Sequence, residues 1–542
     1  MEYSQNFIGL YTKSFRNHFD YLALSNYGAD VKFTYGDMAK EIAKLHILFE
    51  EHNVKQGEKI ALIGKNNAYW CIIFMASVTY GAVIVPILQD FSANDVHHIV
   101  NHSGSKLLFV SDSTLKNLDE KLMPSLKAVF PFSDKNLLDM QDSLNKKFSE
   151  KYPTGFTVED IHYQEFPNEN LVILNYTSGT TGFSKGVLLT GNNLIGNLAF
   201  AHQEMKIKKG DNLVSLLPLA HAYGCGFEFL FPMKEGCHVI LLGKTPSPNI
   251  LLSAFKEYKP SLIIAVPLIL EKIYKRMIIP VITKKSFTFA LKVPLLNQLL
   301  YSAIRKKLIK AFGGQFIQVV IGGAPLNAEV EEFLLKIKFP VSVGYGMTEC
   351  APLISFSLYP KYIPLSCGKI LPNMQVRIDS PDPYKIAGEI QVKGQNVMVG
   401  YYNNEEATQS AFTEDGWLKT GDLGTIDKDN NIFIRGRSKD MLLSAAGQNI
   451  YPEEIEAKLN NLPYVGDSLV VNKNGKLIAL VYPDYETAKQ NGVSQDDLRK
   501  IMDENTAVLN KMVASYERIA EIQLTDEFEK TPKRSIKRYL YK

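Results

Sequence analysis

The pattern of apolar and polar positions predicts many short strands separated by helices. Residues 39–52 place apolar side chains at helical spacing. Nearly continuous apolar runs follow at 57–64, 82–88, 105–112, 171–176, 212–218, 238–242, 260–267 and 316–323. Short, β-branched runs with helices between them are typical of parallel sheets that are buried on both faces. The first four-fifths of the chain is therefore predicted to be an α/β domain of parallel-rich sheets flanked by helices.

The pattern changes after about residue 375. Residues 374–380, 388–394 and 431–437 alternate apolar and polar positions, with Gly, Asn and Asp between the segments. A period of two indicates strands with one buried face and one solvated face. This stretch is predicted to be an antiparallel β subdomain.

The end of the chain predicts a separate, small α+β domain. An Asn-Gly pair lies between two strand patterns within 468–483, which indicates a β-hairpin. A helical pattern covers 496–513, and a last strand pattern covers 518–524. Polar residues in the segment GRSKD interrupt the pattern before this domain. We therefore expect an N-terminal domain of residues 1–438 and a C-terminal domain of residues 439–542.

Composition and charge exclude some classes of protein. With 542 residues the chain is too long for a single core, in agreement with two or more domains. Hydrophobic residues make up 46% and charged residues 22%, as in ordinary globular proteins. The net charge is +3, from 60 Lys and Arg against 57 Asp and Glu. A dedicated nucleic-acid-binding protein would carry a strong basic excess, so no nucleic-acid partner is expected.

Cysteine and histidine positions argue against a disulfide framework or a zinc site. The five cysteines have no CxxC spacing and are odd in number, which favours a reducing, cytoplasmic setting. His97, His98 and His102 lie close together but lack a set of cysteine or carboxylate partners. The N-terminus has no signal-peptide pattern. No stretch reaches the roughly eighteen apolar residues of a membrane-spanning helix.

Residues 276–312 mix large apolar side chains with lysines and arginines. Two interpretations remain open. The segment could lie against the inner face of a membrane, as basic amphipathic segments do. It could instead be a buried helical hairpin beside a substrate tunnel, which we favour because apolar stretches most often belong to the core.

Residues 171–190 carry the strongest chemical signal in the chain. A strand pattern ends at Tyr176, and Lys185 follows a run rich in Gly, Ser and Thr. That run consists of Thr177, Ser178, Gly179, Thr180, Thr181 and Gly182. Its glycines let the backbone approach a ligand closely, and successive N–H groups and hydroxyls can surround phosphate oxygens with the lysine as counter-charge. The Walker loop is excluded because Gly, and not Ser or Thr, follows Lys185.

The twelve residues YTSGTTGFSKGV (176–187) resemble the signature loop YTSGTTGxPKGV of the AMP-forming acyl-CoA synthetases, members of the adenylate-forming superfamily. The one departure in the loop is Ser184, where proline is usual. The resemblance covers most of the chain, and it implies a large N-terminal domain with a small, mobile C-terminal lid. It also implies ATP, Mg²⁺ and coenzyme A as cofactor and co-substrates.

Two further segments resemble the family's nucleotide-binding motifs. In IGGAPL (321–326), the resemblance implies that Gly323, Ala324 and Pro325 line the adenine. In GYGMTEC (344–350), it implies that Tyr345 and Gly346 contact adenine, Thr348 contacts phosphate and Glu349 ligates Mg²⁺. An oxygen ligand suits a hard cation that bridges phosphates.

Motifs on the C-terminal side and one motif upstream complete the resemblance. WLKTGDLG (417–424) implies that Asp422 holds the ribose hydroxyls, because a carboxylate accepts two hydrogen bonds from a diol. In the segment from 434 to 456, Arg437 would reach the ribose or phosphate and Lys439 would be the hinge. Gly447 would line the approach of the CoA thiol. His221, in LPLAHAYG (217–224), stands where the family places a gate to the acyl pocket.

The C-terminal tail departs from the family at one catalytic position. The family has a lysine followed by Ile-x-Arg, and that lysine bridges the carboxylate and the α-phosphate. Here the quartet is Ser535-Ile536-Lys537-Arg538, so a serine without charge or reach replaces the lysine. Lys533 or Lys537 could substitute through a shift of register; the enzyme could be weakened in adenylation; or the change could have been introduced deliberately. These alternatives stay open.

The implied reaction is activation of an acid to acyl-AMP, followed by transfer to CoA. Softer matches around 266–277 and in the tail resemble the long-chain fatty acid branch, and the apolar segments of 227–300 could line a deep tunnel. A medium-chain or aryl acid is the alternative within the family. Because of Ser535, a non-catalytic acyl-adenylate-binding protein is the alternative outside it. A P-loop kinase is disfavoured because the full pattern GxxxxGK[ST] is absent.

Overall fold

The structure is a computed structural model that describes residues 4–133, 136–137, 140–177, 184–284, 296–443, 449–473, 476–531 and 536–541. The chain divides into two compact units, which are described separately. The larger unit comprises Met1–Gln375 and Val392–Leu418, and the smaller unit comprises Val376–Gln391 and Lys419–Lys542. The expected functional boundary at residue 438 stays a prediction.

A seven-stranded sheet in the larger unit carries the predicted phosphate loop. Its strand order is β19-β8-β7-β4-β3-β5-β6. The pairs β4–β7, β3–β4, β3–β5 and β5–β6 are parallel, whereas β7–β8 and β8–β19 are antiparallel. The strands are β3 (Lys59–Ile63), β4 (Val83–Ile87), β5 (Leu107–Ser111), β6 (Ala128–Phe132), β7 (Leu171–Thr177), β8 (Lys185–Thr190) and β19 (Gly400–Tyr401). The parallel part of the sheet agrees with the prediction from sequence.

Three smaller sheets complete the strands of this unit. Their orders are β2-β1-β10-β9, β11-β12-β13 and β14-β15-β16. Strands β11, β12 and β13 are parallel, as are β1, β10 and β9. The strands are β1 (Leu22–Asn26), β2 (Lys32–Thr34), β9 (Asn212–Ser215), β10 (His238–Leu241), β11 (Leu262–Ala265), β12 (Gln318–Ile321), β13 (Val341–Val343), β14 (Tyr345–Gly346), β15 (Leu353–Phe356) and β16 (Lys369–Ile370).

Side-chain caps start several helices of the larger unit. Thr34, Ser92 and Thr190 each form a capping box, in which the side chain accepts from a backbone N–H of the first turn. Helix α3 is buried along its whole length, as expected for a helix that is apolar all round. The helices are α1 (Phe7–Asn17), α2 (Tyr35–Glu51), α3 (Ala68–Thr79), α4 (Ala93–Ser103), α5 (Asp112–Leu115), α6 (Gln141–Lys151), α7 (Gly191–Glu204), α8 (Ala222–Gly224), α9 (Phe231–Glu235), α10 (Pro248–Tyr258), α15 (Ala328–Lys336) and α16 (Glu405–Ala411).

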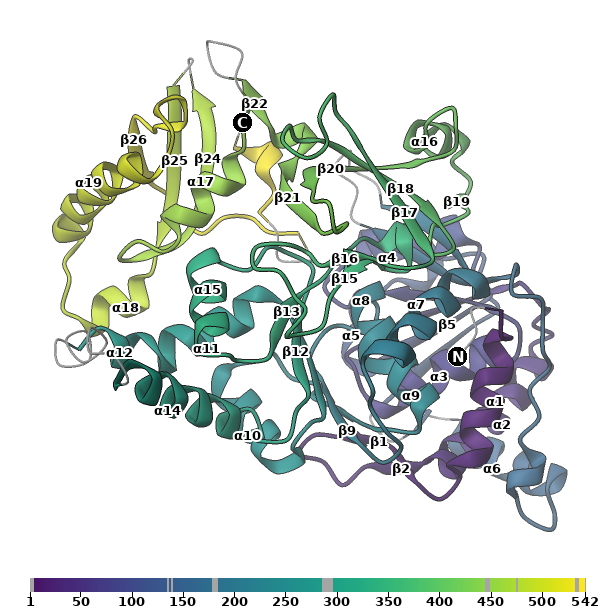
Figure 1. Ribbon diagram of the computed structural model, residues 1–542. Helices are drawn as coiled ribbons and strands as arrows, with labels where there is room; N and C mark the ends of the chain where they lie inside the picture. Colours follow the sequence, from purple (N-terminus) through teal and green to yellow (C-terminus); the bar gives the residue numbers. More distant parts are fainter. Residues whose placement is uncertain are drawn as a thin grey trace. The chain divides into compact units, whose positions relative to one another are not determined.

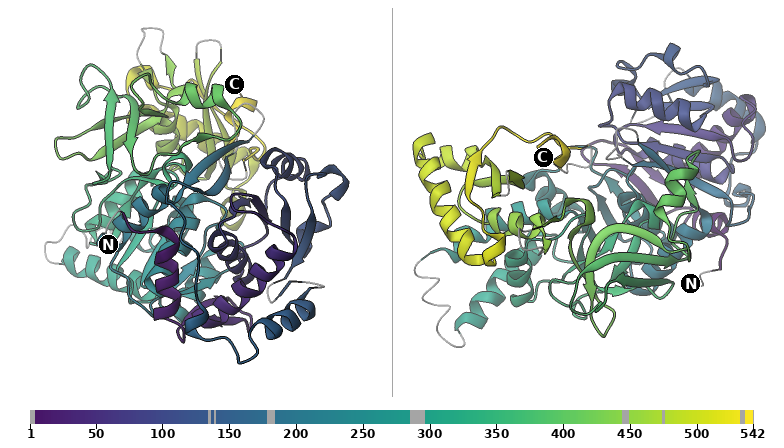
Figure 2. Two further views of the ribbon diagram at one scale, coloured as in Figure 1. Left: turned by 90° about the vertical axis from the view of Figure 1, so that its right-hand side faces the viewer. Right: turned by 90° about the horizontal axis from the view of Figure 1, so that it is seen from above.

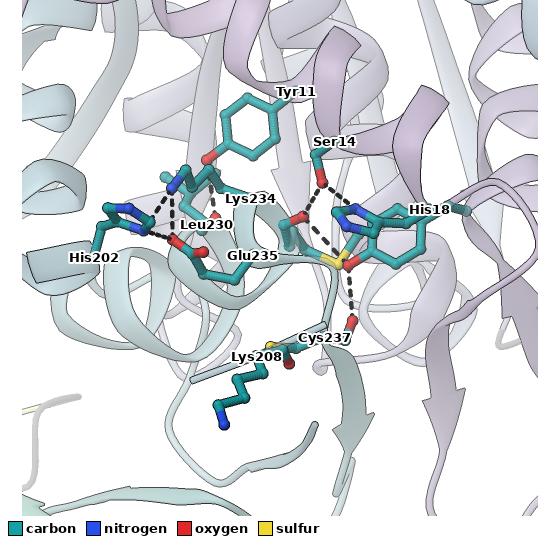
Figure 3. A network of polar contacts seen from close by, with 11 residues as sticks. Tyr11, Ser14, His18, His202, Lys208, Leu230, Lys234, Glu235 and Cys237 are labelled. Carbon is teal, nitrogen blue, oxygen red and sulfur yellow. Dashed lines mark hydrogen bonds and ion pairs between the residues drawn. The ribbon is translucent and has the colours of Figure 1, made fainter. Parts of the chain in front are cut away.

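Hydrogen bonds fix helix α1 to the region of α9, as Figure 3 shows. The Tyr11 hydroxyl donates to the carbonyl oxygen of Leu230 at 3.0 Å, and the Ser14 hydroxyl donates to that of Met233 at 2.7 Å. These two hydrogen bonds hold the N-terminal helix against α9 and the helical turn before it.

The segment 276–312 is helical where the structure describes it. It includes the end of α11 (Pro267–Met277), the short α12 (Ile279–Ile282) and all of α14 (Leu296–Ala311). Ile278, Ile304 and Leu308 belong to a core cluster of this unit, which supports the core interpretation. Leu296 and Leu299 on α14 are 40% and 68% exposed, and the other exposed positions of this helix include Lys306, Lys307 and Lys310. Among the described residues, no helix is both long enough and apolar enough to cross a membrane.

The predicted antiparallel subdomain is a four-stranded sheet of order β17-β18-β20-β21, most of which belongs to the smaller unit. Its strands are β17 (Met374–Asp379), β18 (Gly388–Gly394), β20 (Leu418–Ile426) and β21 (Ile432–Arg437). Strands β20 and β21 are antiparallel. The long green ribbons of this sheet are clearest in the right-hand view of Figure 2.

The rest of the smaller unit has the predicted α+β composition. Strand β24 (Val465–Lys473) pairs antiparallel with β25 (Lys476–Pro483), so the hairpin strands are confirmed; the Asn-Gly turn lies outside the described residues. Strand β26 (Glu521–Leu524) adds parallel to β25. Figure 1 shows α17 and α19 beside this sheet. The other elements are β22 (Leu442–Leu443), β23 (Asn449–Ile450), α17 (Pro452–Leu459), α18 (Tyr485–Gln490) and α19 (Gln495–Met512). The predicted fold class is confirmed.

Candidate active site

The phosphate-loop sequence connects two paired strands, β7 and β8. Thr177 ends β7 and Lys185 begins β8, and the antiparallel register places them opposite each other. The predicted phosphate contacts Ser178, Gly179, Thr180, Thr181 and Gly182 lie outside the described residues. Both ends of the loop are therefore fixed by two paired strands of the seven-stranded sheet, β8 and β7.

Lys185 and Glu349 are connected by a residue that the sequence did not single out, Tyr401. The Nζ atom of Lys185 lies over the Tyr401 ring, 5.0 Å from its centroid. The Tyr401 hydroxyl donates to Oε1 of Glu349 at 2.9 Å. Burial, together with the adjacent Glu349 charge, raises the pKa of Tyr401, so the phenol stays protonated. Cation, ring and carboxylate thus lie in a row at the root of the loop.

The environment of Glu349 fits a magnesium ion that is held mainly by phosphates. The side chain is partly buried, and the carboxylate keeps free lone pairs beyond its bond from Tyr401. Within the described residues no group of three His, Cys, Asp or Glu could form a protein cage for a metal. Mg²⁺ commonly uses one or two carboxylates plus substrate phosphates and water. Glu349 is the residue that would hold it.

The two predicted adenine segments lie side by side. The Gly344 N–H, just before Tyr345, donates to the carbonyl oxygen of Ile321 at 2.8 Å. Gly323 has φ of 83°, a conformation that favours glycine. A Cβ on Gly346 would lie 2.1 Å from the carbonyl oxygen of Pro352, so no other residue fits there without movement.

The predicted adenine contacts differ in exposure. Gly323, Ala324 and Pro325 follow β12 and are exposed, and Thr348 is partly buried at the start of a 3₁₀ turn. The Tyr345 side chain is 6% exposed. The structure thus brings the two segments together, whereas the roles of these residues toward adenine and phosphate stay predictions.

The segment that carries His221 is tied to both nucleotide-side strands. Asn175, on β7 two residues before Thr177, donates from Nδ2 to the carbonyl oxygen of Ala220 at 2.9 Å. The Tyr223 hydroxyl donates to the carbonyl oxygen of Val320 on β12 at 3.2 Å. The predicted acid gate is therefore positioned relative to the phosphate loop and the adenine segment. Sequence reasoning missed Asn175 and Tyr223.

A buried carboxyl group holds the start of the same segment. Glu228 lies in a π-helical turn, Cys225–Leu230, and is 1% exposed. It accepts hydrogen bonds from the N–H groups of Leu216 and Leu217 at 3.0 and 2.9 Å, and from the Ser215 hydroxyl at 3.1 Å. Burial raises the pKa of Glu228 to about 8, although these hydrogen bonds oppose the shift. Its proton is therefore linked to stability near neutral pH.

Glu228→Gln should change how stability depends on pH. The pKa of about 8 lies above the ordinary 4.5. The stability that the neutral carboxyl contributes is therefore complete below pH 4.5 and lost as the pH rises through 8. The amide cannot ionise and keeps an acceptor oxygen. As the pH rises from about 5 to 9, the free energy of unfolding of Glu228→Gln should increase relative to that of the natural protein by a few kcal/mol. The relative increase should not exceed about 1.4 kcal/mol per pH unit. Denaturation midpoints across this range test it; a constant difference between the two proteins would contradict it.

The predicted ribose-binding pair lies in the smaller unit. Asp422 on β20 and Arg437 on β21 are register partners, and Arg437 Nε lies 2.8 Å from Asp422 Oδ1. The Asp422 side chain is 8% exposed and that of Arg437 is 51% exposed. The guanidinium thus orients a nearly buried carboxylate. Lys439 lies in the 3₁₀ turn Ser438–Asp440 that follows, and Gly447 lies outside the described residues.

The described part of the tail is anchored by Arg538. Its guanidinium pairs with the Glu456 carboxylate on α17 through two hydrogen bonds, one of them 2.9 Å from Nη1 to Oε1. Asp440 and Glu453 are each 3.9 Å away. Sequence reasoning missed this anchor, for which the only signal was the acidic run at 453–456.

Of the two lysines that could replace the missing catalytic lysine, Lys537 lies within the described residues. Lys537 Nζ lies 3.2 Å from the Glu529 carboxylate. Ser535 and Lys533 lie outside the described residues. Lys537 is therefore engaged by a carboxylate of its own unit in this structure.

Comparison with known proteins agrees with these motifs. Residues 11–402 match the family described as AMP-binding enzyme. A long-chain-fatty-acid–CoA ligase of Gallus gallus (ACSBG2) is 28% identical over 85% of this chain and 65% of that protein. One of Mycobacterium bovis (FadD15) is 29% identical over 81% and 75%. The chain thus spans about two thirds to three quarters of the length of these relatives.

A solved structure shares the fold. The ATP-bound MatB from Rhodopseudomonas palustris superposes with a TM-score of 0.78 at 22% identity, covering 99% of this chain and 98% of that chain. The family match covers more than half of the chain and includes the phosphate-loop, adenine and Glu349 segments. The chain therefore belongs to the AMP-binding enzyme family.

Proposed function

We propose that the protein is an AMP-forming acid–CoA ligase that acts on a long-chain fatty acid. In the first step a carboxylate oxygen bonds to the α-phosphorus of ATP and the bond to pyrophosphate breaks. In the second step the CoA sulfur bonds to the acyl carbon, its proton leaves, and the bond to AMP breaks. The row of Lys185, Tyr401 and Glu349 at the root of the phosphate loop carries this proposal.

The chain would contribute positioning and charge, which suffice for phosphoryl and acyl transfer without an enzyme nucleophile. Thr177 and Lys185 would hold phosphate oxygens. Glu349 would hold Mg²⁺, which neutralises phosphate charge when bound. Asp422 and Arg437 would hold the ribose.

The identity of the acid rests on weaker support. The names of the Gallus gallus and Mycobacterium bovis relatives favour a long acyl chain, at 28% and 29% identity. A medium-chain or aryl acid is the alternative. We further propose that His221 gates the acyl pocket and that coenzyme A enters past Gly447.

The setting of the enzyme and the movement of its domains are also proposals. We propose that residues 439–542 act as a lid that turns about Lys439 between the two steps. None of the five cysteines forms a disulfide, which supports a cytosolic setting. The exposed Leu299 and the lysines of α14 could add contact with the inner face of an anionic membrane, which co-sedimentation with vesicles would detect.

Product analysis tests the function. With Mg-ATP, CoA and a series of acids, we expect AMP and pyrophosphate in equal amounts, and acyl-CoA from the preferred acid. The natural protein and Ser535→Lys are compared. Activity of both means that another tail group, such as Lys537, replaces the missing lysine; activity of Ser535→Lys alone means that Ser535 weakens adenylation. ADP as product, or ATP binding without turnover in both proteins, would overturn the proposal.

A further inference from the structure

Tyr401 contacts both charged groups at the root of the phosphate loop. Its hydroxyl donates to Glu349 at 2.9 Å, and its ring lies 5.0 Å below the Lys185 ammonium. The backbone holds the same pieces together, because the Met398 N–H donates to the carbonyl oxygen of Glu349 at 2.8 Å. Tyr401 belongs to β19, the edge strand that pairs with β8. The tyrosine is therefore placed by the sheet itself.

We propose that Tyr401 is a positioning residue that orients Glu349 toward the magnesium of bound Mg-ATP and holds Lys185 in reach of the phosphates. This inference rests on the proposed function for the role of Glu349. Tyr401 itself would not touch the reacting atoms. It would act through Glu349 and Lys185, which would contact the magnesium and the phosphates.

The hydroxyl has the chemistry of an outer-shell partner of a metal ligand. A carboxylate that ligates a metal is normally oriented by a hydrogen bond from a neighbouring group, and loss of that bond typically costs about 10–100-fold in metal affinity or activity. The bond from Tyr401 occupies one lone pair of Oε1 and leaves the others for a cation. A tyrosine hydroxyl ordinarily carries its proton at neutral pH, so it can donate this bond.

The ring has a second effect, on Lys185. A cation is attracted to the face of an aromatic ring, which restricts the flexible Lys185 ammonium group to one region. The Tyr401 N–H also donates to the Thr408 hydroxyl at 2.9 Å, so the ring is anchored from its own backbone. Removing the hydroxyl alone should therefore affect Glu349, whereas removing the whole ring should also affect Lys185.

The neighbouring Tyr402 is a matched control. Tyr402 directly follows β19, and its N–H donates to the carbonyl oxygen of Gly186 at 2.8 Å. The Tyr402 ring contacts His102, with centroids 5.7 Å apart, and Lys59 Nζ lies 5.0 Å from it. There it lines a cavity of about 240 Å³ together with His98 and His102, and Lys185 borders the same cavity. Among the described residues the Tyr402 hydroxyl has no hydrogen bond to Glu349 or Lys185, so Tyr402→Phe keeps both contacts of Tyr401.

The experiment compares Tyr401→Phe, Tyr401→Leu and Tyr402→Phe. Binding of Mn²⁺ in the presence of ATP is followed by electron paramagnetic resonance, without an acid substrate. We expect Tyr401→Phe to weaken Mn²⁺ binding about 10-fold or more while ATP alone binds as before. Tyr401→Leu should also weaken the binding of ATP alone, because Lys185 loses its restraint. Tyr402→Phe should match the natural protein in both measurements.

Turnover provides the second readout. The Mg²⁺ concentration for half-maximal pyrophosphate release should rise with Tyr401→Phe, while kcat at saturating Mg²⁺ stays within a few-fold. Equal Mn²⁺ affinity in Tyr401→Phe and the natural protein would overturn the inference, as would a natural protein that binds no Mn²⁺ with ATP. A shift in Mn²⁺ binding without turnover on any acid would support the inference and reject the ligase proposal.

Discussion

Glu349→Gln is expected to lower pyrophosphate release by about 10²–10³-fold, the usual cost of losing one charged contact to a phosphoryl or acyl transition state. The amide has the same shape and can still accept the Tyr401 hydroxyl, which in the natural protein donates to Oε1 at 2.9 Å. The change removes the negative charge and replaces one carboxylate oxygen with an NH2 group, which cannot ligate a cation. If Glu349 ligates Mg²⁺, metal binding fails while the surrounding packing stays intact. The measurement is pyrophosphate release as a function of Mg²⁺ concentration, with the best acid from the product analysis.

The matched control is Glu405→Gln, at the exposed start of α16 in the same unit. It removes the same charge from the same unit and should leave activity unchanged. Full activity of Glu349→Gln at ordinary Mg²⁺ would contradict the metal-ligand role. A loss of activity that high Mg²⁺ does not relieve, with normal Mn²⁺–ATP binding, would assign Glu349 a different task.

The losses of activity caused by Glu349→Gln and Tyr401→Phe should not be additive. Tyr401 acts through Glu349, so Tyr401→Phe should cost little more once Glu349 is already Gln. Additive losses would mean that the hydroxyl acts by another route. The order of effects is itself a test, because the ligand must matter more than the group that orients it.

The sequence predicted those features well that depend only on a short, contiguous stretch of residues. Strands such as 57–64 and 171–176 are nearly continuous apolar runs, and the hairpin within 468–483 has its turn residues in place. The loop ends Thr177 and Lys185 were found for the same reason, because one short motif contains both. Local pattern suffices for such features.

What the sequence did not predict depends on strand order. Tyr401 reaches Lys185 only because β19 joins the sheet next to β8, although more than two hundred residues separate them. Asn175 on β7 bonds to Ala220, in the turn between β9 and α8, for a similar reason. One sequence contains no signal for such neighbours, since the pairing of distant strands is set by the packing of the whole unit.

Arg538→Met should destabilise the smaller unit by about 3–5 kcal/mol, the usual cost of breaking one side of a buried ion pair. The Arg538 side chain is 19% exposed, and that of Glu456 is 8% exposed. Glu456 also accepts from the Val470 N–H at 2.7 Å, so it cannot turn to solvent without breaking the contact between α17 and β24. The loss should appear as faster hydrogen exchange of backbone amides in α17 and β24.

The dependence on pH identifies the cause. Burial raises the pKa of Glu456, and Arg538 counteracts the shift. Without the guanidinium the pKa of the folded state rises further above that of the unfolded chain. The stability contributed by the neutral carboxyl is then lost over a wider range as the pH rises, so the deficit of the variant should grow with pH and shrink in acid. A deficit that is the same at pH 5 and pH 8 would mean that lost packing, and not an unpaired charge, is responsible.

Two further variants complete the test of the Arg538 anchor. Arg499→Met is the surface control: its pair with Asp496 is 3.9 Å apart with side chains 75% and 89% exposed, and such exposed pairs contribute about 0–1 kcal/mol. Arg538→Met combined with Glu456→Leu replaces the pair with apolar groups, a change that is often neutral or stabilising. It should recover most of the stability that Arg538→Met loses. If the double variant recovers this stability, Arg538 serves mainly to neutralise the buried Glu456 charge. The tail that carries Ser535 and Lys537 can then be held by apolar packing alone. If the double variant does not recover it, the geometry of the ion pair itself is needed to hold the tail.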